Sequence, residues 1–225
     1  MRQLNSIDLS GSFAPLVARR RATPDFKPDP VPEELLTRAL ELATLAPSGF
    51  NLQPWRFIVV RDPHQKRKLR AAAYGQPKVE RAPVMIVACG DTVAWKNGDL
   101  ERVIADGLAN GSIPDEKAAE STRETVTNFL STTDLGIWVT RQTMLAFSFL
   151  MLAAESLGLD TAPMEGFDES KVRAAFGIPE TTRVVALMGI GRLAPPDKPF
   201  GGRFDLGKTV HADRWGARFD ALISR

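Results

Sequence analysis

Hydrophobic residues along this chain recur at two spacings, one typical of helices and one typical of buried strands. Apolar positions three or four residues apart predict helices over residues 32–46, 65–73, 100–109, 115–130, 138–157 and 169–176. Short β-branched runs bounded by turn residues predict strands over residues 57–60, 84–88, 159–162 and 184–190. Helices and strands do not alternate regularly, so a doubly wound sheet fits poorly. The expected fold class is α+β, with helices around one central sheet.

The helix expected over residues 138–157 is apolar on nearly every side, which implies burial against the sheet and against a further surface. A second subunit would supply that surface. The most apolar stretch, residues 144–154, is shorter than the roughly 20 residues that span a bilayer, so we expect a buried helix and no membrane partner. Asn5, Ser6 and Asp8 interrupt the start of the chain, which therefore does not resemble a signal peptide.

Composition and charge narrow the class of protein. A length of 225 residues, with 44% hydrophobic and 25% charged residues, predicts one globular domain over residues 1–225. The 29 basic and 27 acidic residues are interspersed, so no nucleic-acid partner is expected. The single Cys89 cannot form an internal disulfide and has no Cys or His neighbour at zinc spacing, which favours a reducing cytoplasm and no metal site.

The first candidate for chemistry is the pair Arg20 and Arg21, followed by Ala22, ahead of the helix expected over residues 32–46. Two adjacent guanidinium groups can bind a phosphate through bidentate, charge-assisted hydrogen bonds. A solvated basic patch that includes Arg19 explains the same residues without a ligand. Both interpretations are open on these residues alone.

The second candidate is the loop after that helix, which contains Pro47, Ser48, Gly49 and Asn51. Such a loop can present backbone N–H groups, a hydroxyl and carboxamides to a flat polar ligand. The alternative is a tightly turned connector whose Trp55 simply belongs to the core.

The third candidate follows the strand expected over residues 159–162 and contains Pro163, Met164, Glu165 and Gly166. A glycine here permits close approach of the backbone to a ligand. In the alternative interpretation, Gly166 only forms a turn and the next helix is capped without any ligand.

Together these segments resemble the nitroreductase family over about residues 18–211. Arg20-Arg21-Ala22 is similar to the family's Arg-Arg-Ser flavin-phosphate loop. Residues 47–55 are similar to its Pro-Ser-x-x-Asn-x-Gln-Pro-Trp signature, and residues 163–166 to its Pro-x-Glu-Gly loop. Ala22 replaces the usual Ser, so only its backbone can serve a phosphate, and Pro24 stands where several relatives have a basic residue.

The resemblance implies a three-layer fold with a central, mainly antiparallel sheet flanked by helices, in an intertwined homodimer. Residues 1–18 would pack in the dimer and residues 95–138 would form a helical excursion over the flavin. FMN would lie at the subunit interface. The implied FMN-binding residues are Arg20, Arg21 and Ala22 from one chain and Pro47, Ser48, Gly49 and Asn51 from the other, together with Gln76, Pro163, Met164, Glu165, Gly166 and Arg203.

Within that set the resemblance implies separate roles. Arg203 would reach the phosphate and Gln76 the pyrimidine edge, while Glu165 and Gly166 would lie near flavin N5. Lys78 is either a further cation near the flavin or an exposed lysine at a helix cap. No side chain needs to act as a nucleophile, since the cofactor carries the reaction.

The implied activity is that of an FMN-dependent NAD(P)H oxidoreductase, which reduces a nitroaromatic, quinone or enone by ping-pong hydride transfer from NADH or NADPH. Specialised flavin chemistry such as reductive dehalogenation, or flavin binding without turnover, are the alternatives. Phe129 and Trp138 are candidate stacking residues for the acceptor, although core packing explains them too. The pattern G-x-x-x-x-G-K-T at residues 202–209 is not expected to bind a nucleotide, because only 16 residues follow it.

Overall fold

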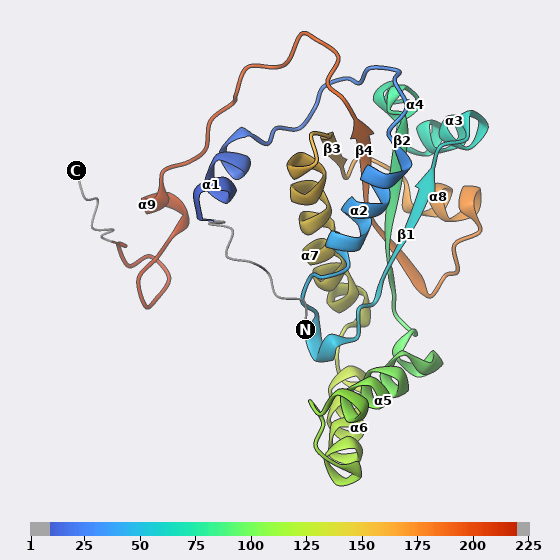
Figure 1. The fold of residues 1–225 in the computed structure, drawn as a ribbon, viewed down its shortest axis with the longest axis vertical. Helices are drawn as coiled ribbons and strands as arrows, with labels where there is room; N and C mark the ends of the chain where they lie inside the picture. The colour runs from blue at the N-terminus through green and yellow to red at the C-terminus, as the bar shows by residue number, and fades with distance from the viewer. Residues whose placement is uncertain (1–9, 220–225) are drawn as a thin grey trace.

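The computed structural model describes residues 10–219, and Figure 1 shows its elements in chain order. Helices and strands alternate irregularly, as the hydrophobic pattern predicts. The elements are α1 (Ser10–Arg19), α2 (Glu33–Ala43), η1 (Gly49–Asn51), β1 (Trp55–Val60), α3 (Pro63–Ala72), α4 (Lys78–Arg81), β2 (Val84–Asp91), η2 (Trp95–Asp99), α5 (Leu100–Asn110), α6 (Glu116–Ser131), α7 (Leu135–Ser156), β3 (Asp160–Met164), α8 (Glu169–Phe176), β4 (Thr182–Gly191) and α9 (Leu206–Thr209).

Each helix and strand expected from the sequence is present, with bounds that differ by a few residues. The pattern did not reveal α1, because Pro15 lies inside it and proline normally interrupts a helix. It also did not reveal α4 and α9, which have four residues each and are too short to show a helical period. Residues 1–9 of the expected N-terminal dimer-packing segment lie outside the described residues.

The strands form one sheet in the order β1-β2-β4-β3, and every neighbouring pair is antiparallel. Trp55 pairs with Gly90 where β1 begins, and Met164 pairs with Leu187 where β3 ends. The predicted antiparallel sheet is therefore confirmed. Its central strand β2 is buried along nearly its whole length, because helices cover both faces of the sheet.

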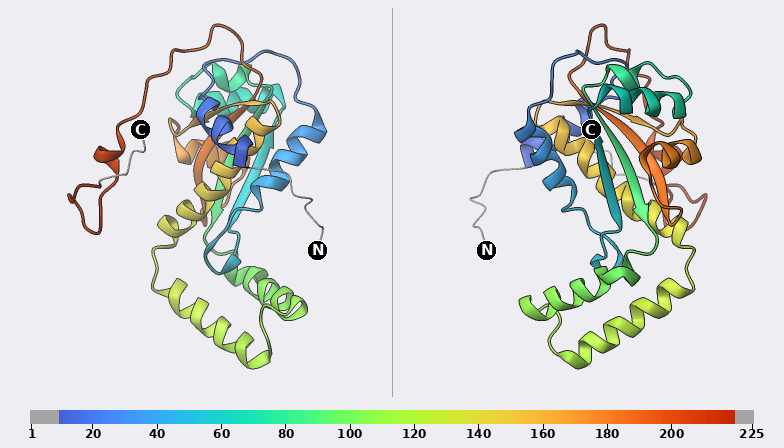
Figure 2. Two further views of the ribbon diagram at one scale, coloured as in Figure 1. Left: turned by 60° about the vertical axis from the view of Figure 1, so that its left-hand side comes forward. Right: turned by 90° about the vertical axis from the view of Figure 1, so that its right-hand side faces the viewer.

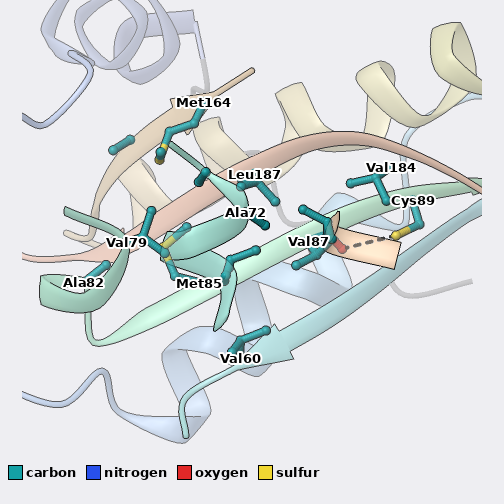
Figure 3. Packing of buried hydrophobic residues seen from close by; sticks show 14 of the residues in the cluster. Val60, Ala72, Val79, Ala82, Met85, Val87, Cys89, Met164, Val184 and Leu187 are labelled. Carbon is teal, nitrogen blue, oxygen red and sulfur yellow. Dashed lines mark hydrogen bonds between the residues drawn. The ribbon is translucent and has the colours of Figure 1, made fainter. Parts of the chain in front are cut away.

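Two apolar clusters define the layers of the fold. On one face, residues such as Met85, Val87 and Leu187 pack under α3, α4 and α8, as Figure 3 shows from close by. On the other face, residues of the sheet such as Ile86 pack against α2 and against Phe147 of α7. The two sets of helices lie on opposite sides of the sheet in Figure 2, which confirms the predicted three-layer fold.

Between β2 and α7 the chain leaves the sheet as a helical excursion made of η2, α5 and α6, seen at the bottom of Figure 1. Its apolar cluster includes Trp95, Ile104 and Val126 and continues into Trp138 and Val139 of α7. The excursion begins and ends close together, since a Cβ on Gly90 would lie only 2.8 Å from Cβ of Val139. Glycine at position 90 thus lets α7 lie directly on β2.

Helix α7 extends over 22 residues and is the one helix of the described part that is long and apolar enough to cross a membrane. It extends beyond the apolar stretch at residues 144–154 and includes Arg141 and other polar residues in its first turns. In the structure it packs against α2, β2 and β4, as the core helix of a folded domain does. Its outer face nevertheless exposes Ile137, Leu145 and Phe149.

Residues 195–219 form a C-terminal arm that runs away from the sheet, seen most clearly at the left of Figure 2. This arm exposes large apolar side chains, among them Phe204, Leu206 and Trp215, the last of which is 91% exposed. An isolated domain seldom exposes so many aromatic side chains on one segment.

Candidate functional site

The arginine loop, residues 20–23, follows α1 and lies along the start of β3. The Thr23 N–H donates to the Thr161 carbonyl at 2.9 Å, and Ala22 forms a parallel bridge with the same residue. Nη1 of Arg20 is buried and has no hydrogen-bond partner among the described residues. The hydroxyl of Thr161 is likewise buried without a partner among them. Buried polar groups are nearly always paired in native proteins, so this corner suits an anion that brings oxygen acceptors.

Arg21 and Arg203 share one aromatic surface. The Arg21 guanidinium lies 3.9 Å from the centre of the Phe200 ring, and that of Arg203 lies 5.1 Å from it. Nη1 of Arg21 also donates to the carbonyls of Ala18 and Arg20, at 2.6 and 2.9 Å. The arm therefore brings Arg203 beside the arginine loop of its own chain.

Gln76 and Gly166 meet although they are 90 residues apart in the sequence. Nε2 of Gln76 donates to the Gly166 carbonyl at 2.8 Å and to the Ala73 carbonyl at 3.1 Å. A Cβ on Gly166 would lie 3.2 Å from the same nitrogen, so the contact is close. Glu165 and Gly166 are both exposed directly after β3, which contains Pro163 and Met164. Two of the segments predicted for the site thus form one surface.

Lys78 lies near this surface, at the start of α4, and is half-buried rather than an exposed cap. Burial, and next the positive charge of Lys198, lower the pKa of Lys78 from its ordinary value. An anion bound nearby would raise that pKa again.

The Pro-Ser loop, residues 47–53, has an unusual backbone. Phe50, Asn51 and Gln53 have φ values of 55°, 56° and 45°, in the left-handed region that residues other than glycine rarely adopt. Each such residue costs on the order of 1 to 3 kcal/mol, and less for asparagine, unless the surroundings hold it. Strained backbone of this kind concentrates at functional sites.

Side-chain hydrogen bonds help to hold the Pro-Ser loop. Oγ of Ser48 accepts from the Gln53 N–H at 3.0 Å, and the Gly49 N–H donates to Oε1 of Gln142 on α7 at 2.8 Å. Ser48 therefore uses its oxygen inside the loop, although its own hydroxyl hydrogen can still donate to a ligand. The Pro47 and Asn51 side chains are exposed.

An aromatic pair lies next to this loop. Phe50 and Phe129 meet edge to face, with ring centres 5.4 Å apart, and both are about 40% exposed at 39% and 44%. Trp138 is 6% exposed and packs close to Gly49, so its role is in the core. Of the two predicted stacking residues, Phe129 alone is available at the surface, and the expectation that it packs in the core is wrong.

One chain does not bring its two half-sites together. The sheet half-site contains the arginine loop, Gln76, Glu165 and Gly166, and the loop half-site is the Pro-Ser loop. Following the strand register through β4 and β2 to Trp55 gives a separation of roughly 25 Å from Thr161, beside the arginine loop, and roughly 18 Å from Met164, beside Glu165, at about 3.4 Å per residue and 4.8 Å per strand. Figure 1 shows the same arrangement, with the Pro-Ser loop at the excursion end of the sheet.

Other motifs do not form a site in the described residues. The segment 202–209 is exposed in the arm and forms only the single turn α9, with no strand before it. His211 packs on Trp215, at 4.7 Å between ring centres, and His64 is exposed on α3. Burial, and next the charge of Glu169, raise the pKa of the Cys89 thiol to about 12, so it stays protonated.

Comparison with known proteins identifies related chains. The model of the Nitroreductase family matches residues 17–192. A protein named NADH dehydrogenase from Thermus thermophilus is 38% identical over 181 residues, which cover 80% of this chain and 86% of that protein. The Bacillus subtilis protein YdfN has 28% identity and a TM-score of 0.84, over 90% of this chain and 99% of its own.

A further solved structure, from Exiguobacterium sibiricum, is in complex with FMN. It has 27% identity and a TM-score of 0.80, over 89% of this chain and 97% of its own. The match to the family model spans residues 17–192, which include the sheet and both half-sites.

Proposed function

Because this chain belongs to the nitroreductase family, we propose that it is an FMN-dependent NAD(P)H oxidoreductase that reduces a nitroaromatic, quinone or enone by ping-pong hydride transfer. The observation that carries this proposal is the buried Nη1 of Arg20, which has no hydrogen-bond partner among the described residues, in the loop whose Arg21 shares the Phe200 ring with Arg203. Guanidinium groups at this loop suit a phosphate monoester such as that of FMN. A relative named NADH dehydrogenase and a similar structure in complex with FMN support the same assignment.

The residues present fit FMN. Arg20, Arg21, Arg203 and the backbone of Ala22 would hold the phosphate, while Gln76 and the Glu165-Gly166 backbone would face the ring system. FMN supplies the hydride-transfer chemistry when it is bound, and the protein supplies orientation and exclusion of water. In this proposal Glu165 and Gly166 act through their exposed backbone, where a glycine permits close approach.

We further propose that the working unit is a homodimer in which Pro47, Ser48, Gly49 and Asn51 of one chain complete the sheet half-site of the other. The separation of the half-sites within one chain supports this. So does an apolar groove of about 360 Å³ between α1, α2 and α7. Phe13, Leu16, Leu45 and Phe149 line it, and the exposed aromatic residues of the arm add more uncovered apolar surface.

A visible absorbance spectrum of the purified protein, recorded before and after anaerobic addition of NADH or NADPH, tests the function. We expect a yellow protein whose flavin absorbance bleaches on addition of one of the two nicotinamides. Yellow protein that does not bleach would point to flavin binding without turnover. Colourless protein that does not take up added FMN would overturn the proposal.

The proposed setting is a reducing cytoplasm. The described part of the chain has one buried thiol, Cys89, and no disulfide. A single thiol that forms no disulfide does not require an oxidising compartment.

A further inference from the structure

Helix α7 lies between the two half-sites, and one of its polar residues contacts the Pro-Ser loop while another pairs with Arg19, the residue directly before the arginine loop. Gln142 lies near the start of the helix and Glu155 lies at its end. They are 13 residues apart, which corresponds to about 20 Å along a helix. The inner and outer faces of the helix between them are mostly apolar. Neither contact was apparent from the sequence pattern.

Gln142 holds the Pro-Ser loop. Its Oε1 accepts the Gly49 N–H at 2.8 Å, one residue before the first left-handed residue, Phe50. The other side-chain bonds to the backbone of this loop come from Ser48, Gln53 and Arg56, which lie within the loop or three residues after it. A backbone that is strained at three positions needs surroundings that hold it, and Gln142 is the side chain that ties it to a regular helix.

Glu155 holds the arginine loop. Its Oε1 accepts from Nε of Arg19 at 2.7 Å, and Arg19 is the last residue of α1, directly before Arg20. The Glu155 side chain is 10% exposed, and a nearly buried carboxylate is costly unless it is paired. A cavity of about 370 Å³ adjoins this pair and is lined in part by Arg21 and Thr23. The ion pair therefore fixes the end of α1 where the arginine loop begins.

We propose that Gln142 and Glu155 are positioning residues for flavin binding, through which α7 sets the geometry of the Pro-Ser loop and of the arginine loop separately. Neither side chain contacts the flavin in this proposal. The inference rests on the proposed function. In the proposed dimer, each flavin would use the Gln142 anchor of one chain and the Glu155 anchor of the other.

The two anchors should differ in which part of the cofactor they affect. Riboflavin has the same ring system as FMN and lacks the phosphate, so comparing the two ligands separates the contributions. We expect Gln142→Leu to weaken binding of FMN and riboflavin alike by about tenfold. A tenfold loss corresponds to the free energy that one hydrogen bond typically contributes. We expect Glu155→Leu to weaken FMN by about tenfold and to leave riboflavin within about twofold.

Conservative variants and a control distinguish positioning from general loss of structure. Gln142→Glu keeps an oxygen acceptor for the Gly49 N–H and should restore most of the flavin affinity. Ser148→Ala is the matched control, because the Ser148 hydroxyl bonds only to the Met144 carbonyl of its own helix. It should leave both affinities unchanged. Circular dichroism of each variant reports whether the fold is retained.

The measurement is flavin titration of the full-length apoprotein, followed by tryptophan or flavin fluorescence. The inference is overturned if the Leu variants bind both flavins as wild type does, if Glu155→Leu loses FMN and riboflavin equally, or if Gln142→Glu fails to restore binding. Wild-type protein that binds neither flavin would overturn the proposed function itself, and the inference with it.

Discussion

The two half-sites of this chain are built in different ways. In the sheet half-site the arginine loop is held by main-chain contacts with Thr161, and the Gln76 side chain donates to the Gly166 carbonyl. The loop half-site is held in a left-handed backbone largely by side chains, those of Ser48, Arg56 and Gln142. Main-chain contacts survive most substitutions, whereas a side-chain anchor can be lost in one. The loop half-site is therefore the part of the site that sequence change alters most easily.

The largest effect should come from the sheet half-site. Arg20→Ala removes a half-buried side chain whose buried Nη1 has no partner within the described chain, and we expect FMN affinity to fall by about 10- to 100-fold. Flavin titration measures the change, with Arg67→Ala on the exposed side of α3 as the control. Equal affinities for Arg20→Ala and wild type would mean that the phosphate is bound elsewhere.

A second substitution tests how tightly α7, which carries Gln142 and Glu155, packs on β2. In Gly90→Ala the new Cβ would lie 2.8 Å from Val139 Cβ and Cγ2 and 3.0 Å from the Thr143 hydroxyl, so α7 must shift away from β2. Overpacking of this kind costs about 1 to 3 kcal/mol, and urea unfolding measures it. Gly207→Ala is the control, because it also adds a methyl group, at a position in α9 where nothing lies within 4 Å of the new Cβ. If Gly90→Ala unfolds like wild type, α7 and β2 are less tightly coupled than the contact implies.

The contribution of the arm should be smaller than that of Arg20. Arg203 is exposed and lies against the same Phe200 ring as Arg21, so Arg203→Ala should lower FMN affinity by about tenfold, or about 1.4 kcal/mol. The comparison is with Arg214→Ala, further along the same arm. A loss in Arg203→Ala greater than in Arg20→Ala would move the centre of phosphate binding to the arm.

The sequence predicted the sheet better than it predicted the site. β-branched runs such as that of β2 are local signals, and they located every strand of the described sheet. The resemblance indicated which loops belong to the site. It did not reveal the bond from Gly49 to Gln142, across 93 residues, or the pair Arg19 and Glu155, across 136. Such contacts depend on how helices pack, which no local pattern records.

The backbone of the Pro-Ser loop was also unpredictable. Left-handed φ values are expected of glycine and sometimes of asparagine, and Gly49 was the obvious candidate. The structure instead places Phe50 and Gln53 in that region. Glu155 is a charged residue in a largely apolar helix, and such a pattern in the sequence indicates an ion-pair partner.

The smallest effect concerns how the free energy of unfolding changes with pH. The Cys89 thiol is buried under α3 and α8, and its pKa is raised to about 12 (Figure 3). The folded protein keeps this proton when the unfolded chain loses it, so the stabilisation is complete below about pH 9 and is lost as the pH rises towards 12. We expect the free energy of unfolding to fall by about 1 kcal/mol by pH 10 relative to Cys89→Val. Identical pH profiles would show that the sheet opens to solvent near Cys89.

The helical excursion leaves β2 and rejoins the fold at α7, where Gly90 and Val139 are in contact. A segment whose two ends meet, and which packs on its own apolar cluster, can lengthen or shorten during evolution at little cost to the sheet. Insertions there would reshape the surface around Phe50 and Phe129 while the main-chain contacts of the arginine loop stay as they are. The architecture thus separates what a lineage must conserve from what it is free to vary.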